Sequence, residues 1–79
     1  MTKTIQFAHA GRQLEIHAKD VGHTVQIWVE EIGKPLHLHS ALARQQVEEA
    51  SASGQDILAA VMQAARLDIE QGRIALPSP

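Results

Sequence analysis

The first half of the chain alternates apolar and polar residues with a period of two, and this pattern limits the fold more than any other feature. The alternation runs through residues 4–9 (TIQFAH), 12–18 (RQLEIHA) and 23–30 (HTVQIWVE), with a shorter fourth stretch at 35–39 (PLHLH). Such alternation is typical of strands that bury one face. The junctions between the stretches contain Gly11, Gly22 and Gly33. Tight hairpin turns prefer glycine, so these junctions are expected to be hairpin turns. We predict an antiparallel meander of three or four strands.

The positions of the two-residue turns determine which residues face each other across the strands. Opposed residues of a hairpin share one face of the sheet, so the correct register sets apolar side chains against apolar side chains. Turns at Ala10-Gly11, Val21-Gly22 and Gly33-Lys34 satisfy this condition. The predicted pairs are Phe7–Leu14 and Ile5–Ile16, then Ala18–Val25, Ile16–Ile27 and Leu14–Val29, and finally Val29–Leu38.

The apolar period changes to that of a helix in the second half of the chain. One helical face collects Leu58, Val61, Met62, Ala65 and Ile69. Ser53 is a suitable N-cap, Gly72 suits the C′ position, and Pro77 and Pro79 prevent continuation. We predict a helix over residues 54–71 that covers the apolar face of the sheet. The fold class is therefore α+β, an antiparallel meander with one C-terminal helix packed on one face.

The remaining segments are less clearly patterned. Residues 41–52 contain good helix formers, but their apolar spacing fits neither a helix nor a strand, and we favour a strand or irregular crossing over 46–50. Residues 1–76 are predicted to form one domain, with a loose extension after the helix and a disordered tail at 77–79. The predicted core is Ile5, Phe7, Leu14, Ile16, Val25, Ile27, Val29, Leu38, Leu58, Val61, Met62, Ala65 and Ile69.

Composition excludes several classes of protein. The chain has 79 residues and no cysteine, so disulfides, thiolate metal sites and cysteine nucleophiles are absent. It contains no apolar run of about 20 residues, which a membrane-spanning helix needs, and its first residues lack the apolar core of a signal peptide. A cytoplasmic protein without a cofactor is expected. Small cores give modest stability, and dimerisation is one common remedy.

Two segments carry a resemblance to known proteins. They are the tryptophan-bearing VQIWVEEIGKPL and the alanine-rich AARLDIEQG, residues 25–36 and 64–72. Over about Leu14 to Gly72 the chain resembles small, uncharacterised bacterial proteins in which a sheet is followed by a helix. The resemblance implies a β-β-β-(β)-α fold and no known activity, and it transfers no catalytic residues.

The stretch KPLHLHS poses the question of a metal site, because it places His37 and His39 two residues apart. In the predicted register both lie on the helix-free face, where His37 opposes Glu30 and His39 opposes Trp28. Two imidazoles and a carboxylate can bind zinc. However, exposed strand positions accept histidine readily, and a cross-strand Glu–His pair is favourable without a metal. We therefore interpret the stretch as an ordinary strand. For the alternative of a metal site, the candidate ligands are His37, His39 and Glu30.

Trp28 breaks the strand pattern because its neighbours face the core while it faces outward. Exposed tryptophans are enriched at interfaces; the alternative is that Gln13, Gln26 and Glu15 cover the ring. Leu67 lies on the far side of the predicted helix and is a second candidate contact. The predicted interaction surface comprises Trp28, Glu15, Glu30, His37, His39 and Leu67.

We therefore predict a non-catalytic protein-interaction module that forms a homodimer through the Trp28 face or an edge strand. A nucleic-acid-associated regulator is the alternative, although the net charge of −2 and the scattered basic residues argue against it. A histidine-based metal-binding module is the third hypothesis. No nucleophile elbow, glycine-rich phosphate loop or paired-carboxylate motif indicates an enzyme.

Overall fold

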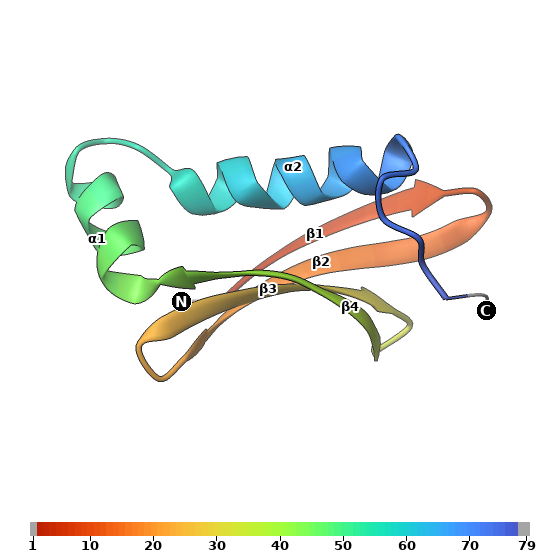
Figure 1. Ribbon diagram of the computed structural model, residues 1–79, viewed down its shortest axis with the longest axis horizontal. Helices are drawn as coiled ribbons and strands as arrows, with labels where there is room; N and C mark the ends of the chain where they lie inside the picture. Colours follow the sequence, from red (N-terminus) through yellow and green to blue (C-terminus); the bar gives the residue numbers. More distant parts are fainter. Residues whose placement is uncertain (1, 78–79) are drawn as a thin grey trace.

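The computed structural model describes residues 2–77 and has four strands followed by two helices. The strands are β1 (Thr2–His9), β2 (Arg12–Val21), β3 (Thr24–Glu31) and β4 (Lys34–Ala43), and the helices are α1 (Arg44–Ala52) and α2 (Ile57–Glu70). The strands form one antiparallel sheet in the order β1-β2-β3-β4. Figure 1 shows α2 lying over one face of this meander, with α1 at one end. The predicted α+β class is confirmed.

The first hairpin has the predicted register, and the other two do not. Phe7 opposes Leu14 and Ile5 opposes Ile16. In the second hairpin, however, Val21 opposes Thr24, so Gly22 is the first of the two turn residues instead of the second. Gly22 has φ of 63°, as the first central residue of a type II′ turn requires. The partners across β2 and β3 therefore differ from the prediction by two residues.

A shift of two residues preserves the faces of a strand and changes only the opposed pairs. The predicted pairs Ala18–Val25, Ile16–Ile27 and Leu14–Val29 are replaced by Asp20–Val25, Ala18–Ile27, Ile16–Val29 and Leu14–Glu31. The apolar face remains intact, which is why hydrophobic matching did not reveal the shift. The altered pairs nevertheless decide which polar side chains meet on the opposite face.

Strand β4 departs further from the prediction because its pairing with β3 contains two irregularities. The third turn is Ile32-Gly33, and the register shifts between Ile27 and Trp28 and again between Val29 and Glu30. An extra residue in a strand reverses the side to which the following side chains point. As a result Leu38 opposes Trp28 and is 60% exposed, so its predicted place in the core, opposite Val29, is wrong.

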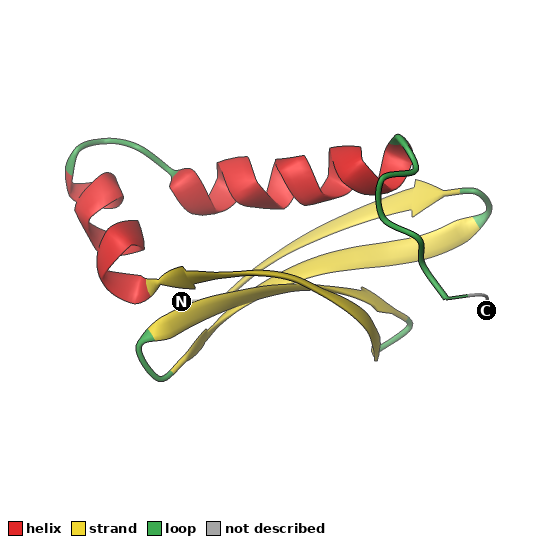
Figure 2. Cartoon of the chain, viewed as in Figure 1, coloured by secondary structure: helices red, strands yellow, loops and turns green. Residues whose placement is uncertain are grey.

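One helix was not predicted, and the other begins later than predicted. Residues 44–52 form α1, so the favoured strand or irregular crossing at 46–50 is wrong. Helix α2 begins three residues later than predicted, because Asp56 rather than Ser53 is the N-cap and accepts a hydrogen bond from the Ala59 N–H. Its C-terminal end agrees with the prediction, since Gly72 follows the helix with φ of 75°. Figure 2 shows α2 over one face of the sheet and α1 beyond the end of β4.

The core lies between the sheet and the helices. Its buried residues are Phe7, Leu14, Ile16, Ala18, Val25, Ile27, Val29, Val47, Leu58, Met62, Ala65 and Ile69. Ile5 and Val61 are only partly buried, and Ala18 and Val47 were not in the predicted core. The segment after α2 is not a loose extension, because Ile74 and Leu76 pack against the core. Most of the disordered tail predicted at 77–79 falls outside the described residues.

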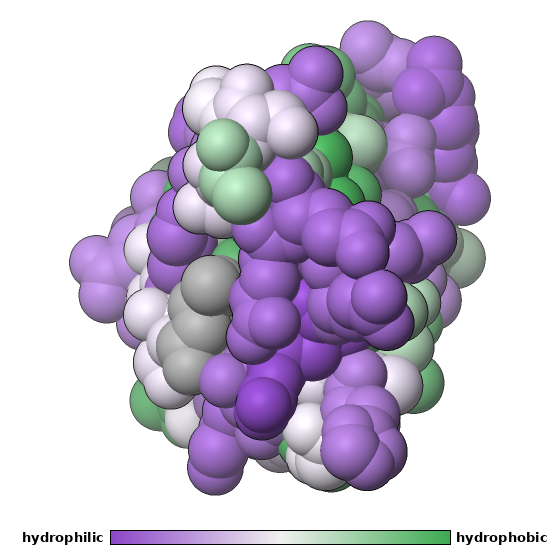
Figure 3. Space-filling view, turned by 90° about the vertical axis from the view of Figure 1, so that its left-hand side faces the viewer, coloured by the Kyte–Doolittle hydropathy of each residue, from purple (hydrophilic) through white to green (hydrophobic). Residues whose placement is uncertain are grey.

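The surface at the α1 end is covered mostly by hydrophilic residues, with few hydrophobic ones between them (Figure 3). Neither helix in residues 2–77 has the length and apolar character needed to cross a membrane.

Candidate functional site

The helix-free face of the sheet carries a cluster of polar side chains on β2 and β3. The observed register sets Glu15 opposite Glu30 and His17 opposite Trp28. The predicted register instead set Glu15 opposite Trp28 and left His17 without a role. The cluster therefore depends on the two-residue difference in the second hairpin.

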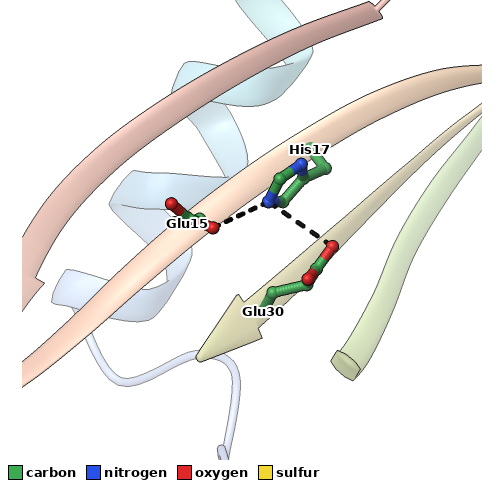
Figure 4. Close-up of side chains that lie close together, drawn as sticks. All are labelled: Glu15, His17 and Glu30. Carbon is green, nitrogen blue, oxygen red and sulfur yellow. Dashed lines mark hydrogen bonds and ion pairs between the residues drawn. The ribbon is translucent and has the colours of Figure 1, made fainter. Parts of the chain in front are cut away.

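His17 lies between the two carboxylates of this cluster (Figure 4). Its Nε2 is 3.0 Å from Oε1 of Glu15 and 3.4 Å from Oε2 of Glu30. The side chains of His17, Glu15 and Glu30 are 21%, 29% and 14% exposed, so the group is sheltered but open to solvent. Their potential ligand atoms all lie within 4.8 Å of one another. Such a mixed nitrogen and oxygen set is suitable for binding a metal ion.

Trp28 is held against this cluster by two contacts. Its ring stacks on the His17 imidazole with centroids 5.5 Å apart and planes 14° apart. Its Nε1–H donates a hydrogen bond of 2.6 Å to Oε2 of Glu30. The outward direction of Trp28 agrees with the prediction, but the ring is half-buried and His17 is its stacking partner.

Residues of β1 complete the network from the other side. Gln6 Nε2–H donates to Oε2 of Glu15 at 2.9 Å, and the Thr4 hydroxyl lies 3.3 Å from Nδ1 of His17. The hydrogen bonds from His17 and Gln6 lower the pKa of the Glu15 carboxyl, because both interactions favour its charged form. Glu15 therefore remains ionised at neutral pH.

The metal candidates predicted from KPLHLHS are not brought together. Glu30 opposes Pro35, and His37 opposes Val29 at one of the irregular positions of β4. His39 approaches α2, where its Nε2 lies 3.5 Å from Oδ2 of Asp68. Residues 34–40 lie in strand β4, so the interpretation as a strand is confirmed, but the pairing of β4 with β3 is irregular. Among the described residues, His37, His39 and Glu30 do not form a group of closely spaced ligand atoms.

Two exposed apolar side chains outside the predicted interaction surface border a hollow that Trp28 also lines. Leu38 is 60% exposed and Val21 is 46% exposed, and both border a hollow of about 660 Å³. The hollow is lined by Val21, Gln26, Trp28, Glu30, Gly33, Pro35, Leu36, His37 and Leu38. Leu67, on α2, is 50% exposed and lies apart from this hollow.

Most basic side chains are engaged with carboxylates. Within residues 2–77, five of the seven lysines and arginines form ion pairs, namely Lys3–Asp56, Arg12–Glu31, Arg44–Glu48, Arg66–Glu70 and Arg73–Asp68. The bidentate pair of Arg12 and Glu31, at 2.7 and 3.0 Å, raises the pKa of the guanidinium and lowers that of the carboxyl. Phosphate binding would compete with these pairs.

His17 is the residue of the cluster that sequence reasoning missed. The sequence allows Gly22 to be either the first or the second residue of the turn, and only the first position brings His17 into the cluster. Placing Gly22 first also sets Glu15 against Glu30, and such a like-charge pair is unfavourable unless a donor lies between them. His17 sits two positions from Glu15 on the same face, so the set can be recognised once both registers are compared.

No family model matches the chain, and no curated protein or solved structure shows significant similarity to it. The resemblance to small bacterial β-β-β-(β)-α proteins thus stays a prediction.

Proposed function

We propose that this chain is a small, non-catalytic protein-interaction module of the cytoplasm that forms a homodimer through the free edge of β1. The proposal rests on a difference between the two edges of the sheet, β1 and β4. β1 pairs with β2 at all eight of its positions without interruption and contains no proline. β4 has two register irregularities and Pro35. Bulges and prolines protect strand edges from pairing with another chain, and β1 lacks both devices.

The edge of β1 is suited to pairing with a second copy of itself. Two antiparallel edge strands related by a two-fold axis present the same N–H and C=O groups to each other, so their hydrogen bonds are reciprocal. Pairing would join two four-stranded sheets into one of eight strands. Lys3 is the one lysine, arginine or carboxylate of β1, and it already pairs with Asp56 at 2.8 Å, so few like charges would meet.

The hydrophobic core is incomplete at the β1 edge, and a second copy would extend it. Ile5 packs against the core but remains partly exposed, and its neighbour on the same face is the buried Phe7. A strand paired with β1 would place side chains beside both. The apolar layer would then continue from one sheet into the other.

Helix α2 supplies complementary charges near the same edge. Arg66 lies over the Phe7 ring at 5.2 Å from its centroid and pairs with Glu70 at 3.6 Å. Across a β1–β1 interface the two β2 strands would be about 14 Å apart. The two α2 helices would run antiparallel, with Arg66 of one copy turned towards Glu70 of the other.

The test compares the same substitution at both sheet edges. Ala8 on β1 and Ala41 on β4 are both exposed, and each opposes a glutamine on its neighbouring strand, Gln13 and Gln26. An interface of one strand edge falls near the low end of known sizes, below about 1,200 Å², so we expect a micromolar dimer. Sedimentation equilibrium over a concentration series should show dimers for the wild type and Ala41→Lys, but monomers for Ala8→Lys.

Two results would overturn the proposal. A wild-type chain that stays monomeric at millimolar concentration has no homodimer. A dimer that Ala41→Lys dissociates while Ala8→Lys leaves it intact uses the β4 edge instead. The far-ultraviolet circular dichroism of each variant establishes that the fold is retained.

A nucleic-acid-associated role receives less support from the surface. The ion pairs of five of the seven basic residues leave little free positive charge for phosphates.

A further inference from the structure

We infer that Glu15, His17 and Glu30 form a binding site for a first-row divalent transition-metal ion, with Zn²⁺ as the probe. This inference does not depend on the proposed homodimer, because the three ligands lie on β2 and β3 and face away from the helices.

The spacing of the donor atoms suits a tetrahedral ion. Zinc lies about 2.1 Å from histidine nitrogen and carboxylate oxygen, so two ligands at a tetrahedral angle are separated by about 3.4 Å. Nε2 of His17 is 3.0 Å from Oε1 of Glu15 and 3.4 Å from Oε2 of Glu30. The ion would replace the proton that Nε2 shares with these oxygens. Both distances from Nε2 are close to the separation that zinc requires.

Residues outside the cluster orient each ligand. Gln6 binds Oε2 of Glu15 and leaves Oε1 directed at His17. Thr4 lies within reach of Nδ1, so a proton on Nδ1 can be donated to its hydroxyl while Nε2 offers a lone pair. Trp28 donates to Glu30 and stacks on His17. Hydrogen bonds of this kind fix the ring orientation in metal sites and increase metal affinity.

Electrostatics favours a cation at the same position. Glu15 and Glu30 are directly opposed on neighbouring strands, and like charges in that arrangement are destabilising. A divalent ion between them would remove the repulsion and add two charge-assisted contacts. Because the three side chains remain partly exposed, a water molecule can occupy the fourth position.

The donor set indicates the class of metal. One imidazole with two carboxylates suits zinc and other first-row divalent ions better than Mg²⁺ or Ca²⁺, which prefer oxygen ligands alone. Protons compete for Nε2 and for the carboxylates, so affinity should fall as the pH is lowered.

The experiment titrates the whole chain with ZnCl₂ and follows Trp28 fluorescence, with stoichiometry measured by calorimetry. Trp28 is the single tryptophan and touches two of the three ligands, so binding should change its emission saturably at one ion per chain. Glu30→Gln and His17→Gln should each weaken Zn²⁺ binding by about tenfold or more, and Thr4→Val by about tenfold. Mg²⁺ should produce no comparable change.

The matched control is His37→Gln, which removes a histidine of the neighbouring strand and should leave the affinity unchanged. The inference is wrong if millimolar Zn²⁺ produces no saturable change in the wild type. It is also wrong if His37→Gln abolishes binding while His17→Gln preserves it. The ¹H–¹⁵N spectrum of each variant verifies the fold, and Glu30→Gln retains an oxygen that can accept from Trp28. A monomeric wild type that binds zinc would reject the dimer without affecting this site.

Discussion

At the scale of single residues, Ile32 is the least suitable side chain for its backbone. It occupies the first central position of the third turn with φ of 51°, and Gly33 follows with φ of 76°. Both angles are those of a type I′ turn, in which asparagine and glycine are preferred. A β-branched residue is rarely found with positive φ. Because Ile32 is 90% exposed, no packing compensates for this cost.

Replacing Ile32 with asparagine should therefore stabilise the protein by about 1 kcal/mol, since asparagine tolerates this conformation. Urea denaturation should show a higher midpoint with an unchanged slope. Ile32→Val keeps the β-branch and should show no gain. A lower midpoint for Ile32→Asn would mean that the exposed isoleucine makes a contact in solution, such as one with another chain.

Among the residues that the structure describes, four carboxylates have a pKa below the ordinary value, and together they predict acid sensitivity. The chief cause is a side-chain hydrogen bond from His17 to Glu15, from Arg12 to Glu31, from Lys3 to Asp56 and from Arg73 to Asp68. A carboxyl with a lowered pKa contributes stability that is complete above its unfolded pKa and is lost as the pH falls through its folded pKa.

The melting temperature should thus be nearly constant near neutral pH and fall between about pH 5 and pH 2. Arg12→Gln should return the pKa of Glu31 towards its ordinary value, so the variant should melt below the wild type at pH 6 and approach it near pH 2. Lys19→Gln, an exposed change of equal charge on β2, serves as the comparison. A constant difference for Arg12→Gln at every pH would contradict the assignment.

At the scale of elements, the sequence predicts the sheet better than the segments that join it to the helix. Alternation identifies the strands and their faces because burial of one face leaves a direct imprint on residue type. Alternation does not reveal the register of the second hairpin or the irregular pairing of β4. A two-residue shift leaves every face unchanged, and the bulges depend on pairing with β3. The polar cluster follows from that register, so hydrophobic matching alone does not predict its composition.

Helix α1 shows a second case in which apolar periodicity does not predict an element. Val47 is its one buried residue among the nine of the helix, so an amphipathic stripe is missing from its sequence. Its helical state depends on local propensity and on this single contact with the core. The length of α2, in contrast, allows its buried residues to recur with a helical period.

Val47→Ala should consequently lower the free energy of unfolding by about 2 kcal/mol, because it removes two buried methyl groups and leaves a cavity. Val21→Ala removes the same atoms from a side chain that is 46% exposed and should change stability by less than about 0.5 kcal/mol. Urea denaturation of both variants measures the difference. Equal losses would mean that α1 does not anchor to the core through Val47.

At the scale of the whole molecule, the two sides of the sheet differ in what they carry. One side is covered by α2, α1 and the segment containing Ile74 and Leu76. The other carries the polar cluster and the exposed Leu38, while the free edge of β1 lies between the two sides. The proposed interface lies at the free edge of β1, whereas the proposed metal ligands lie on β2 and β3 and are contacted by Thr4 and Gln6 of β1.

Self-association should couple stability to concentration. If the folded dimer is the stable species, its melting temperature rises with protein concentration by mass action. Differential scanning fluorimetry of the wild type and of Ala41→Lys should show this rise, whereas Ala8→Lys should melt at the same temperature throughout. An invariant wild-type melting temperature would argue against a dimer.

The meander topology also has a kinetic consequence. Each strand pairs with the next along the chain through a two-residue turn, so the sheet can be assembled from local hairpins that form in about 1–10 μs each. The helix that covers the apolar face comes after all four strands. During synthesis the sheet can therefore form while its apolar face is still bare. That nascent sheet, rather than the finished protein, is the state in which aggregation and chaperone binding compete with folding.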